Sequence, residues 1–454
     1  MKIFPDTKVY MICPANIHSG GPELCHQLVS QLIQFGVDAY LLYMPNPNVT
    51  FNPDNPVDDF YVKYHCPYVL KIEDAPHNIL ILNESANWIY FEVKHIQKIF
   101  WWMSVDNYVH DIADIIKSFE GDALREPMTK FFYFEPDDTE HWVQSAYAFQ
   151  FVLLNGVSKE KVHVVEDYVS QAFLTHADKI DISKKENAVL FNPKKGFKVT
   201  KKLVELAPDI HWLPIINLTP EQVQILLEGS KVYIDFGNHP GKDRIPREAA
   251  LSGCVVITGK RGAAANDTDI NIPAEFKFGE TEADLPLVIE KIRDVFDNFE
   301  ANHAKQNDYR ARILDDKSRF AKEVAAAFNL KPQRKNFVAL AQGLSKTSIM
   351  LADFIYRMNP EHFPTFLIDN RFCTSENSDE STFIKTIQNT NYFYSKKIGG
   401  GQPIMIISAE DAKFLYLEGR LNKFALFNPT AEEIDLINKI FNPAQEDLMI
   451  VNIE

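Results

Sequence analysis

Five residues suited to binding a phosphorylated ligand lie close together between Asp235 and Ala250. They are His239, Lys242, Arg244, Arg247 and Glu248. The cations could stabilise a diphosphate as it leaves, and Glu248 could accept hydrogen bonds from ribose hydroxyls. The stretch follows a predicted strand and opens a predicted helix, and parallel sheets bind their ligands at this end of their strands. The alternative interpretation is a salt-bridged loop without a ligand.

A second basic segment, Asn192–Gly196, also follows a predicted strand directly. Lys194 and Lys195 would stand at the carboxyl end of that strand, at the mouth of the sheet. Two ammonium groups in this position are well placed to meet an anionic ligand. A solvated charged turn accounts for the same residues equally well.

Two turns that contain glycine could bring backbone amides to a ligand. Gly20 and Gly21 stand between the first predicted strand and helix, where free N–H groups and the helix dipole favour a phosphate. Gly262 and Ala263 follow another predicted strand, and small residues with exposed amides suit a phosphate or a sugar. A tight turn and a flexible surface loop are the alternative interpretations.

A polar strand end in the first half could hold the second substrate. Asp106 follows a predicted strand with two tryptophans, Ile99–Met103. The aromatic side chains favour a core position. Asp106 and its neighbours Ser104 and Asn107 stand where an acceptor could be bound.

These candidates are positioned by a chain that alternates between strand and helix patterns. In the first half, apolar runs predict strands, and apolar residues at helical spacing predict helices. The predicted strands are 9–13, 38–44, 78–82, 99–103 and 162–165, and the predicted helices are 23–35 and 140–154. Sequential βαβ units imply a parallel sheet.

A polar segment at 178–187 predicts a linker, after which a second alternating series begins. Its predicted strands are 188–191, 212–216, 232–236 and 255–258, and its predicted helices are 200–206, 220–227 and 245–251. Residues 285–328 predict one or two long, largely solvated helices. A third series has predicted strands at 337–341, 365–368, 404–407, 424–427 and 448–451. We therefore predict an α/β protein with domains at 1–180, 187–330 and 337–454.

The amino-acid composition favours a folded cytoplasmic protein and argues against a nucleic-acid-binding one. Of the 454 residues 46% are hydrophobic and 24% charged, which is typical of a folded chain, and the formal net charge is -15. So acidic a chain argues against a nucleic-acid partner, which needs clustered lysine and arginine. Five scattered cysteines without a C-x-x-C pair favour a cytoplasmic setting and predict no zinc site. We expect neither a signal peptide nor a membrane-spanning helix.

Taken in order, these segments resemble the retaining GT-B glycosyltransferases of the large family 4 type, over residues 1–330. That family has a Gly-Gly loop after its first strand, a Lys-Gly turn opening its second domain, a Glu that begins a helix, and then a Gly-rich loop. The matching segments here are Gly20-Gly21, Lys195-Gly196, Glu248–Ile257 and Arg261–Ala264. The resemblance implies two Rossmann-like domains facing across a cleft, with 337–454 as a smaller α/β segment.

The resemblance also implies an activity, the transfer of a sugar from a nucleotide-diphosphate sugar to a hydroxyl acceptor. The donor-binding residues would be Gly20, Gly21, Lys194, Lys195, His239, Arg247, Glu248, Gly262 and Ala263. The catalytic residues would be Lys195, Lys242, Arg244 and Asp106, with the acceptor near Asp106 or His110. No metal or other cofactor is expected, since lysine and arginine would stabilise the leaving diphosphate.

The family's common use suggests bacterial surface polysaccharide or capsule synthesis as the setting. The acceptor would then be a glycan or a lipid-linked glycan. Peripheral contact with the inner face of the membrane, or with a sister enzyme, stays open in this interpretation.

Two departures from the family pattern keep another class of function open. The family's Glu-x7-Glu motif has Pro240 at its first position here, and Asn192 and Pro193 stand where an arginine is common. A non-catalytic GT-B-like partner that binds a glycan, a nucleotide or a sister glycosyltransferase is therefore the alternative. Asp267-Thr268-Asp269 is a D-x-D triplet that resembles the metal site of the GT-A fold, and we rank it below the basic site.

Overall fold

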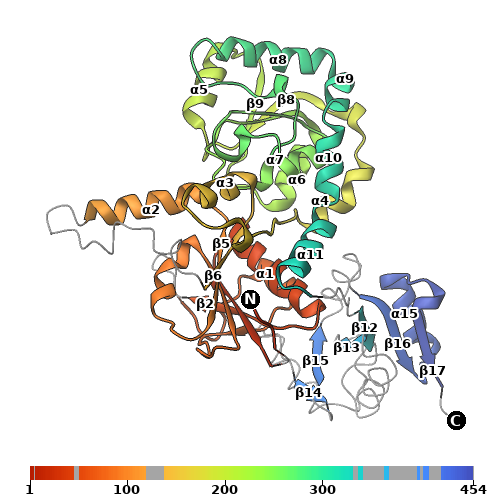
Figure 1. Cartoon of the computed structure of the whole chain (residues 1–454). Helices are drawn as coiled ribbons and strands as arrows, with labels where there is room; N and C mark the ends of the chain where they lie inside the picture. The colour runs from red at the N-terminus through yellow and green to blue at the C-terminus, as the bar shows by residue number, and fades with distance from the viewer. Residues whose placement is uncertain are drawn as a thin grey trace. The chain divides into compact units, whose positions relative to one another are not determined.

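The computed structural model describes residues 1–4, 6–44, 51–118, 138–330, 336–340, 362–367, 396–398, 402–407 and 421–452 (Figure 1). The chain separates into two compact units. The first unit comprises residue 1, residues 81–93 and residues 97–327. The second unit comprises residues 2–80, 94–96 and 328–454.

The first sheet has the strand order β3-β2-β1-β4-β5-β6-β7. Its strands are β1 Lys8–Pro14, β2 Asp38–Met44, β3 Tyr68–Val69, β4 Ile79–Asn83, β5 Gln97–Trp102, β6 Thr139–Val143 and β7 Val162–Val164. The pairs β1–β2, β2–β3, β5–β6 and β6–β7 are parallel. This order, with the first strand inside the sheet, is that of a Rossmann-type sheet, so the predicted parallel α/β arrangement is confirmed.

The helices that accompany this sheet are α1 Gly20–Gln34, α2 Val105–Ser118 and α3 Ala146–Leu154. The short helix α4, Gln171–His176, instead packs with α7, Arg244–Leu251, of the second sheet. One prediction here is wrong, because residues 140–143 belong to strand β6 and the helix begins only at Ala146. The strand was hidden by His141, which is buried and accepts a 3.1 Å hydrogen bond from the Trp102 indole. A buried, hydrogen-bonded histidine thus replaces an apolar residue in the strand pattern.

The second sheet lies in the first unit and has the order β11-β10-β8-β9. Its strands are β8 Glu186–Phe191, β9 His211–Pro214, β10 Ser230–Asp235 and β11 Val255–Thr258, and all three pairs are parallel. Val189, Val232 and Val256 are completely buried in its core. The strand order reverses between β8 and β10, and open α/β sheets bind ligands at the carboxyl ends of strands at such a reversal.

The helices between these strands are α5 Phe197–Leu206, α6 Pro220–Gly229 and α7 Arg244–Leu251. They are followed by α8 Leu285–Asp297, α9 Phe299–Ala304, α10 Asn307–Leu314 and α11 Asp316–Ala327. Helix α5 packs with α8 and α6 packs with α7, and Figure 1 shows the two pairs around the strands. Residues 285–327 therefore form four shorter helices rather than the one or two long ones predicted.

The C-terminal segment also carries a mostly parallel sheet, of order β14-β15-β13-β12-β16-β17. Its strands are β12 Asn336–Leu340, β13 His362–Leu367, β14 Lys396–Ile398, β15 Gln402–Ile407, β16 Leu421–Phe427 and β17 Leu448–Val451. Helix α15, Ala431–Phe441, begins at a capping box in which Thr430 and Glu433 satisfy each other's backbone amides. The strands predicted in this segment are confirmed.

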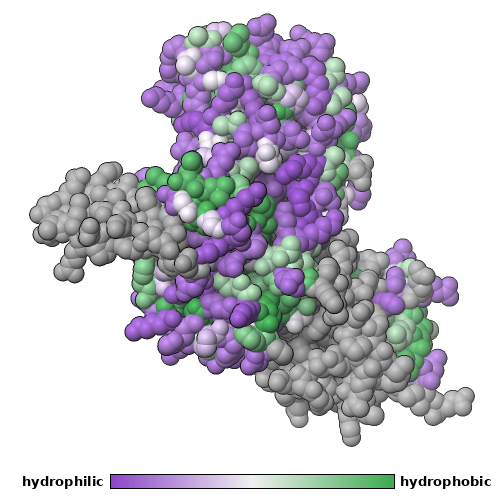
Figure 2. Space-filling model, in the orientation of Figure 1, coloured by the Kyte–Doolittle hydropathy of each residue, from purple (hydrophilic) through white to green (hydrophobic). Residues whose placement is uncertain are grey.

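The surface is mixed in polarity over the described part of the chain. In Figure 2 the face formed by α5, α8 and α9 is mainly hydrophilic, with small hydrophobic spots. Phe197, Leu206 and Leu287 are among the exposed apolar residues of these helices. None of the described helices combines the length and apolar character needed to span a membrane.

Candidate functional site

The basic turn after β8 meets the loop after β10 at the strand-order reversal of the second sheet. Gly196 has a φ of 61° and begins α5, and a Cβ at this position would overlap the backbone carbonyl of Phe236. Only glycine combines a left-handed backbone with so close an approach. The sequence therefore holds the two loops against each other at the point where a doubly wound sheet binds its ligand.

The contact between the Gly196 turn and the loop after β10 positions the side chain of Lys195. Its Nζ lies 2.8 Å from Oδ1 of Asp243, a residue of the loop after β10. The Lys195 side chain is 36% exposed, so its ammonium group has one carboxylate partner and a face toward solvent. Lys194 is exposed, and its amide donates to Oδ1 of Asn192 at 3.0 Å. Of the two predicted lysines, Lys195 is therefore the one that reaches from the turn after β8 to the loop after β10.

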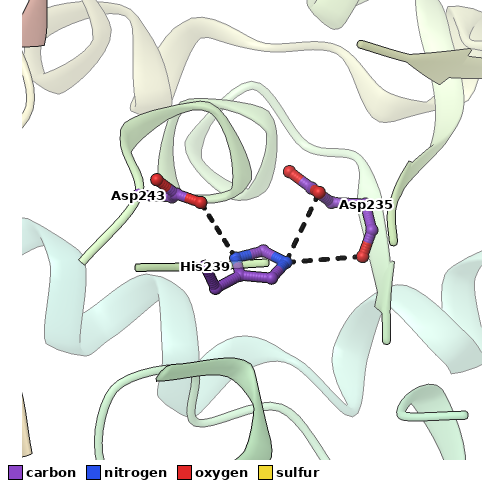
Figure 3. A group of neighbouring side chains, drawn as sticks. All are labelled: Asp235, His239 and Asp243. Atoms are coloured by element: carbon purple, nitrogen blue, oxygen red, sulfur yellow. Dashed lines mark hydrogen bonds and ion pairs between the residues drawn. The ribbon is translucent and has the colours of Figure 1, made fainter. Parts of the chain in front are cut away.

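The loop after β10 is organised around His239, which is completely buried (Figure 3). Its Nδ1 lies 3.1 Å from Oδ2 of Asp243, and its Nε2 lies 3.4 Å from Oδ1 of Asp235. Burial disfavours the charged ring, but the hydrogen bond to Asp243 and the two negative charges outweigh burial and raise the pKa of His239. Burial also opposes ionisation of Asp243, yet His239 and Lys195 lower its pKa to about 2.

Lys242 and Arg247 belong to a buried charge cluster with Glu166, Asp167 and Asp316. The Lys242 ammonium group pairs with Glu166, and lies 3.1 Å from Oδ1 of Asp316. Arg247 donates to Oδ1 of Asp167 at 2.6 Å and to Oδ2 of Asp316 at 3.1 Å. Both predicted cations are thus present near the loop, and each is held between two carboxylates inside the protein.

Charges in this cluster support one another electrostatically. Burial works against ionisation of Asp167, but the charges of Arg247, Arg244 and Lys242 hold its pKa below the usual range. Burial likewise opposes the charged form of Arg247, and the two carboxylates raise its pKa. A cluster of this kind is costly to open, because removing one member leaves a buried charge without a partner.

The remaining predicted residues of this stretch lie on α7. Arg244 begins the helix and its Nε lies 3.3 Å from Oδ2 of Asp167. Glu248 is one turn further on and is partly exposed. A carboxylate on the helix that follows β10 has the chemistry to accept hydrogen bonds from a hydroxyl-rich ligand.

The Gly-rich turn after β11 packs directly on the His239 loop. Gly262 has a φ of 55°, and a Cβ there would overlap the carbonyls of Asn238 and His239. Ala263 is buried and its amide donates to the His239 carbonyl at 2.9 Å. The structure thereby brings Gly262 and Ala263 beside the loop that carries Asp243.

The same loop also touches the turn between β5 and α2. The Val105 amide donates to the Pro240 carbonyl at 3.0 Å, and a Cβ at Gly241 would overlap the Met103 carbonyl. Pro240 therefore provides a carbonyl for this contact. Glu84, at the end of β4, accepts a 3.1 Å hydrogen bond from the Met103 amide, and its burial raises its pKa to about 7.

Asp106 and His110 lie on α2, close to that contact in the chain. Asp106 is partly exposed and accepts a 2.7 Å hydrogen bond from the Tyr147 hydroxyl. Burial and this bond raise the pKa of Tyr147 to about 12, so the hydroxyl remains a donor at neutral pH. His110 is exposed and lies 4.0 Å from the carboxylate of Asp111.

Gly20 and Gly21 are the first two residues of α1, in the second unit. Both are exposed, and a Cβ at Gly21 would meet nothing within 4 Å. The preceding residue is fixed by Tyr61, whose hydroxyl donates to the Ser19 carbonyl at 2.6 Å and lies 2.8 Å from the Ser19 amide. The helix N-terminus is thus both open and held in position.

The carboxylates of the D-x-D triplet have structural partners. Asp269 accepts hydrogen bonds of 2.7 and 3.0 Å from the amides of Ala146 and Tyr147, which begin α3. Asp267 lies 3.0 Å from the Nζ of Lys277. Asp269 therefore serves as a cap for a helix that is distant in the sequence.

Asp235, His239 and Asp243 together also have the residue types of a metal site, within the described ranges. Figure 3 shows the two carboxylates at different nitrogens of the ring. A metal ion replaces the proton on one histidine nitrogen and gathers its ligands around one point. An arrangement with the ring between the two carboxylates fits a protonated histidine better than it fits a metal ligand.

The carboxylate partners are the part of this arrangement that the sequence did not predict. Asp243 had a signal, since it stands inside the basic stretch that sequence analysis identified. The others lie far from their partners in the chain and had none. They are Glu166, Asp167 and Asp316, which are separated from Lys242 by 76, 75 and 74 positions.

No protein-family model matches the chain, and no curated protein sequence matches it. Solved structures do match. HepE from Anabaena, in complex with UDP-glucose, is 11% identical, with a TM-score of 0.48 over 71% of this chain and 99% of HepE. Sucrose-phosphate synthase from Thermosynechococcus elongatus is 12% identical, with a TM-score of 0.44 over 71% of this chain and 95% of the synthase.

A third similar structure is WaaG, a glycosyltransferase involved in lipopolysaccharide biosynthesis. It is 10% identical, with a TM-score of 0.43 over 72% of this chain and 100% of WaaG. Because these TM-scores lie below 0.5, no residue's role is carried over from these structures to this chain.

Proposed function

We propose that the protein is a glycosyltransferase that moves a sugar from a nucleotide-diphosphate sugar to a hydroxyl acceptor. The observation that supports this most is Lys195, a half-exposed ammonium group at the strand-order reversal of a parallel sheet. Asp243 holds it from the opposite loop at 2.8 Å. A cation fixed there can meet the negative charge that develops on a leaving diphosphate.

Further donor contacts are proposed at the same end of the second sheet, where its strands have their carboxyl ends. Glu248 would accept hydrogen bonds from the ribose, and the amides around Gly262 and Ala263 would approach the sugar or the phosphates. The N-terminus of α1, at Gly20 and Gly21, belongs to the second unit, and its amides would by themselves favour a phosphate. The bond between the sugar carbon and the diphosphate oxygen breaks with its electron pair on the diphosphate, where Lys195 stabilises the charge. The acceptor hydroxyl oxygen bonds to that carbon, and its proton passes to the departing diphosphate.

Lys242 and Arg247 act less directly in this proposal. Each is buried and paired with two carboxylates, so each is better suited to hold the loop and α7 than to reach a ligand. Arg244 is less deeply buried and stays a candidate for the diphosphate. Charge stabilisation by these residues is also why we propose a metal-independent reaction.

The acceptor would lie near Asp106 or His110, with the transfer retaining the configuration of the sugar. We further propose a bacterial surface polysaccharide or glycoconjugate as the product, made from a glycan or lipid-linked acceptor. The reaction would take place in the cytoplasm, with peripheral contact to the membrane where the acceptor is lipid-linked.

The proposal is tested by thermal shift with UDP, GDP, CDP, ADP and their sugar conjugates, each with and without EDTA. A bound nucleotide raises the melting temperature by mass action. A shift that persists in EDTA, followed by release of nucleoside diphosphate when alkyl glycosides are added, supports the proposal. A shift that requires a divalent metal would favour the Asp267–Asp269 triplet instead.

The second candidate function is a non-catalytic partner that binds a nucleotide or a glycan. Pro240 favours it, because the family glutamate expected at that position is absent. Metal-independent nucleotide binding without turnover of any donor, with all acceptors tried, would support this second function over the first.

A further inference from the structure

His239 occupies a backbone conformation that few residues other than glycine adopt. Its φ is 47°, and its side chain is completely buried beneath the loop after β10. A left-handed conformation costs a residue with a side chain about 1 kcal/mol or more, so its surroundings must hold it there. The Ala263 amide, which donates to the His239 carbonyl at 2.9 Å, fixes the backbone.

The ring itself is held by charge. Nδ1 faces Asp243 and Nε2 faces Asp235, at 3.1 and 3.4 Å (Figure 3). A neutral imidazole has a single N–H and can donate to one of them only, whereas an imidazolium donates from both nitrogens. Because one carboxylate faces each nitrogen, the arrangement favours the imidazolium, in which both nitrogens carry a proton.

Asp243 links this ring to the lysine of the proposed donor site. Its Oδ2 faces His239 and its Oδ1 faces Lys195. Asp235 is held in turn by the Tyr233 hydroxyl and the Gly237 amide, at 3.0 and 2.8 Å. The charged groups that act on His239 are Asp235, Asp243 and Lys195. When the His239 ring is protonated, the ring and Lys195 carry two positive charges, which balance the two negative charges of Asp235 and Asp243.

We propose that His239, as an imidazolium between Asp235 and Asp243, is a positioning residue that keeps Lys195 available to the diphosphate. The ring shares the negative charge of Asp243, so the carboxylate holds Lys195 without neutralising it fully. Loss of the proton leaves Lys195 as the nearest cation to Asp243. The ammonium group is then drawn toward the carboxylate and away from the ligand.

This inference rests on the proposed function, and it predicts how charge changes in the loop alter turnover. His239→Asn removes the charge while keeping a residue that tolerates a left-handed backbone. We expect kcat to fall about tenfold or more, with a much smaller change in KM, because Lys195 matters most as the diphosphate leaves. The wild-type kcat should also fall as pH rises through the raised pKa of His239, and this limb should be missing in H239N.

A double mutant separates a charge effect from a packing effect. H239N leaves the loop with one excess negative charge, which D243N removes. The H239N/D243N protein should therefore regain about threefold or more of the kcat lost in H239N, a non-additive result expected of coupled charges. A double mutant no faster than H239N would overturn the proposal, because the kcat lost in H239N would then not depend on the negative charge of Asp243.

His303→Asn is the matched control. His303 also lies in the first unit and is partly buried, and burial and the nearby Arg310 lower its pKa to about 4, so it is neutral near pH 7. H303N should leave the pH profile of kcat unchanged. A profile altered equally by H303N and H239N would contradict a specific role for the charge on His239.

A measurement independent of activity distinguishes the two proposals. Nitrogen NMR of labelled histidines in the full chain, assigned by the signal missing in H239N, reports the protonation of both ring nitrogens. We expect an imidazolium at pH 7, and a neutral tautomer there would overturn the inference. If wild-type protein neither binds nucleotides nor transfers sugar, the proposed function fails while this spectrum still reports the charge.

Discussion

The two basic segments of the second sheet supply two groups of positive side chains, which differ in burial and in the number of their carboxylate partners. Lys242 and Arg247 are buried in the buried charge cluster, each between two carboxylates. Lys195 has one carboxylate partner and keeps about a third of its side chain exposed. A buried, doubly paired cation stabilises the fold, whereas a half-exposed one can still bind an anion. The comparison therefore divides the predicted basic residues into those that hold the loop and those that can act on a ligand.

The largest effect on the fold is expected from breaking the buried charge cluster. Arg247→Met removes the completely buried cation that Asp167 and Asp316 share. Asp167 then keeps Arg244 as a partner and Asp316 keeps Lys242, at 3.3 and 3.1 Å, so each buried carboxylate loses one of its cations. We expect a loss of about 3–5 kcal/mol in the free energy of unfolding, measured by urea denaturation. Arg244→Met is the matched control, because Arg244 lies on the same helix and is more exposed. Equal free energies of unfolding for the two variants would contradict the idea that the more deeply buried arginine is the one that stabilises the fold.

Lys195→Met should have the opposite profile, with a large effect on turnover and a small one on the fold. The Lys195 side chain is 36% exposed and Asp243 keeps His239 as a partner, so loss of the Lys195–Asp243 pair should cost about 1 kcal/mol of stability. Loss of a preorganised charge at the leaving group should lower kcat about 100-fold or more. Lys194→Met, one residue earlier and exposed, is the control and should retain turnover within about threefold. If Lys194→Met proved as slow as Lys195→Met, the charge of the whole turn, rather than the geometry of Lys195, would be responsible.

Sequence patterns predicted the elements that position this site, because apolar runs and helical spacing are local signals. Val255–Thr258 and Asp38–Met44 were predicted to the residue, and Lys195 was predicted at the end of β8. The division between the two groups of cations could not be predicted. It depends on Asp316 and Glu166, which lie more than 70 positions from Lys242 and reach it only through the fold.

Strand β6 is a second case in which a partner distant in the sequence kept a feature from being predicted. Its pattern contains His141, which sequence reasoning took for part of a helix. The Trp102 indole satisfies that histidine from the neighbouring strand. A polar residue whose partner is supplied by the tertiary structure cannot be distinguished from a solvated one by its sequence context alone.

A third prediction concerns pH and the contact between the His239 loop and the β5–α2 turn. Glu84 has a pKa of about 7 in the folded chain against 4.5 ordinarily. Between these values the folded state keeps a proton that the unfolded state releases, so this carboxyl lowers stability as pH rises. The loss should approach about 1.4 kcal/mol per pH unit within that window.

Glu84→Gln isolates this contribution, since the amide cannot ionise and can still accept a hydrogen bond from Met103. The stability of wild type relative to E84Q, followed by urea denaturation, should fall between about pH 4.5 and 7 and stay level above it. Glu140→Gln is a contrasting control, because hydrogen bonds from His163 and the N-terminal amine overcome burial and lower the Glu140 pKa to about 2. Its difference from wild type should instead change below about pH 4.5.

The smallest effect is expected at Asp269, whose carboxylate accepts hydrogen bonds from two backbone amides and from the Asn266 side chain and pairs with no cation in the described residues. It accepts from Ala146 and Tyr147 at the start of α3. Asp269→Ala removes this cap and should cost about 1–2 kcal/mol of unfolding free energy, whereas Asp267→Ala, which loses an exposed partner of Lys277, should cost less. A role in metal binding predicts something else, namely that both substitutions abolish a divalent-metal-dependent shift in melting temperature. We expect no such shift in wild type, so that the two variants differ only in stability and Asp269 proves the more important of the pair.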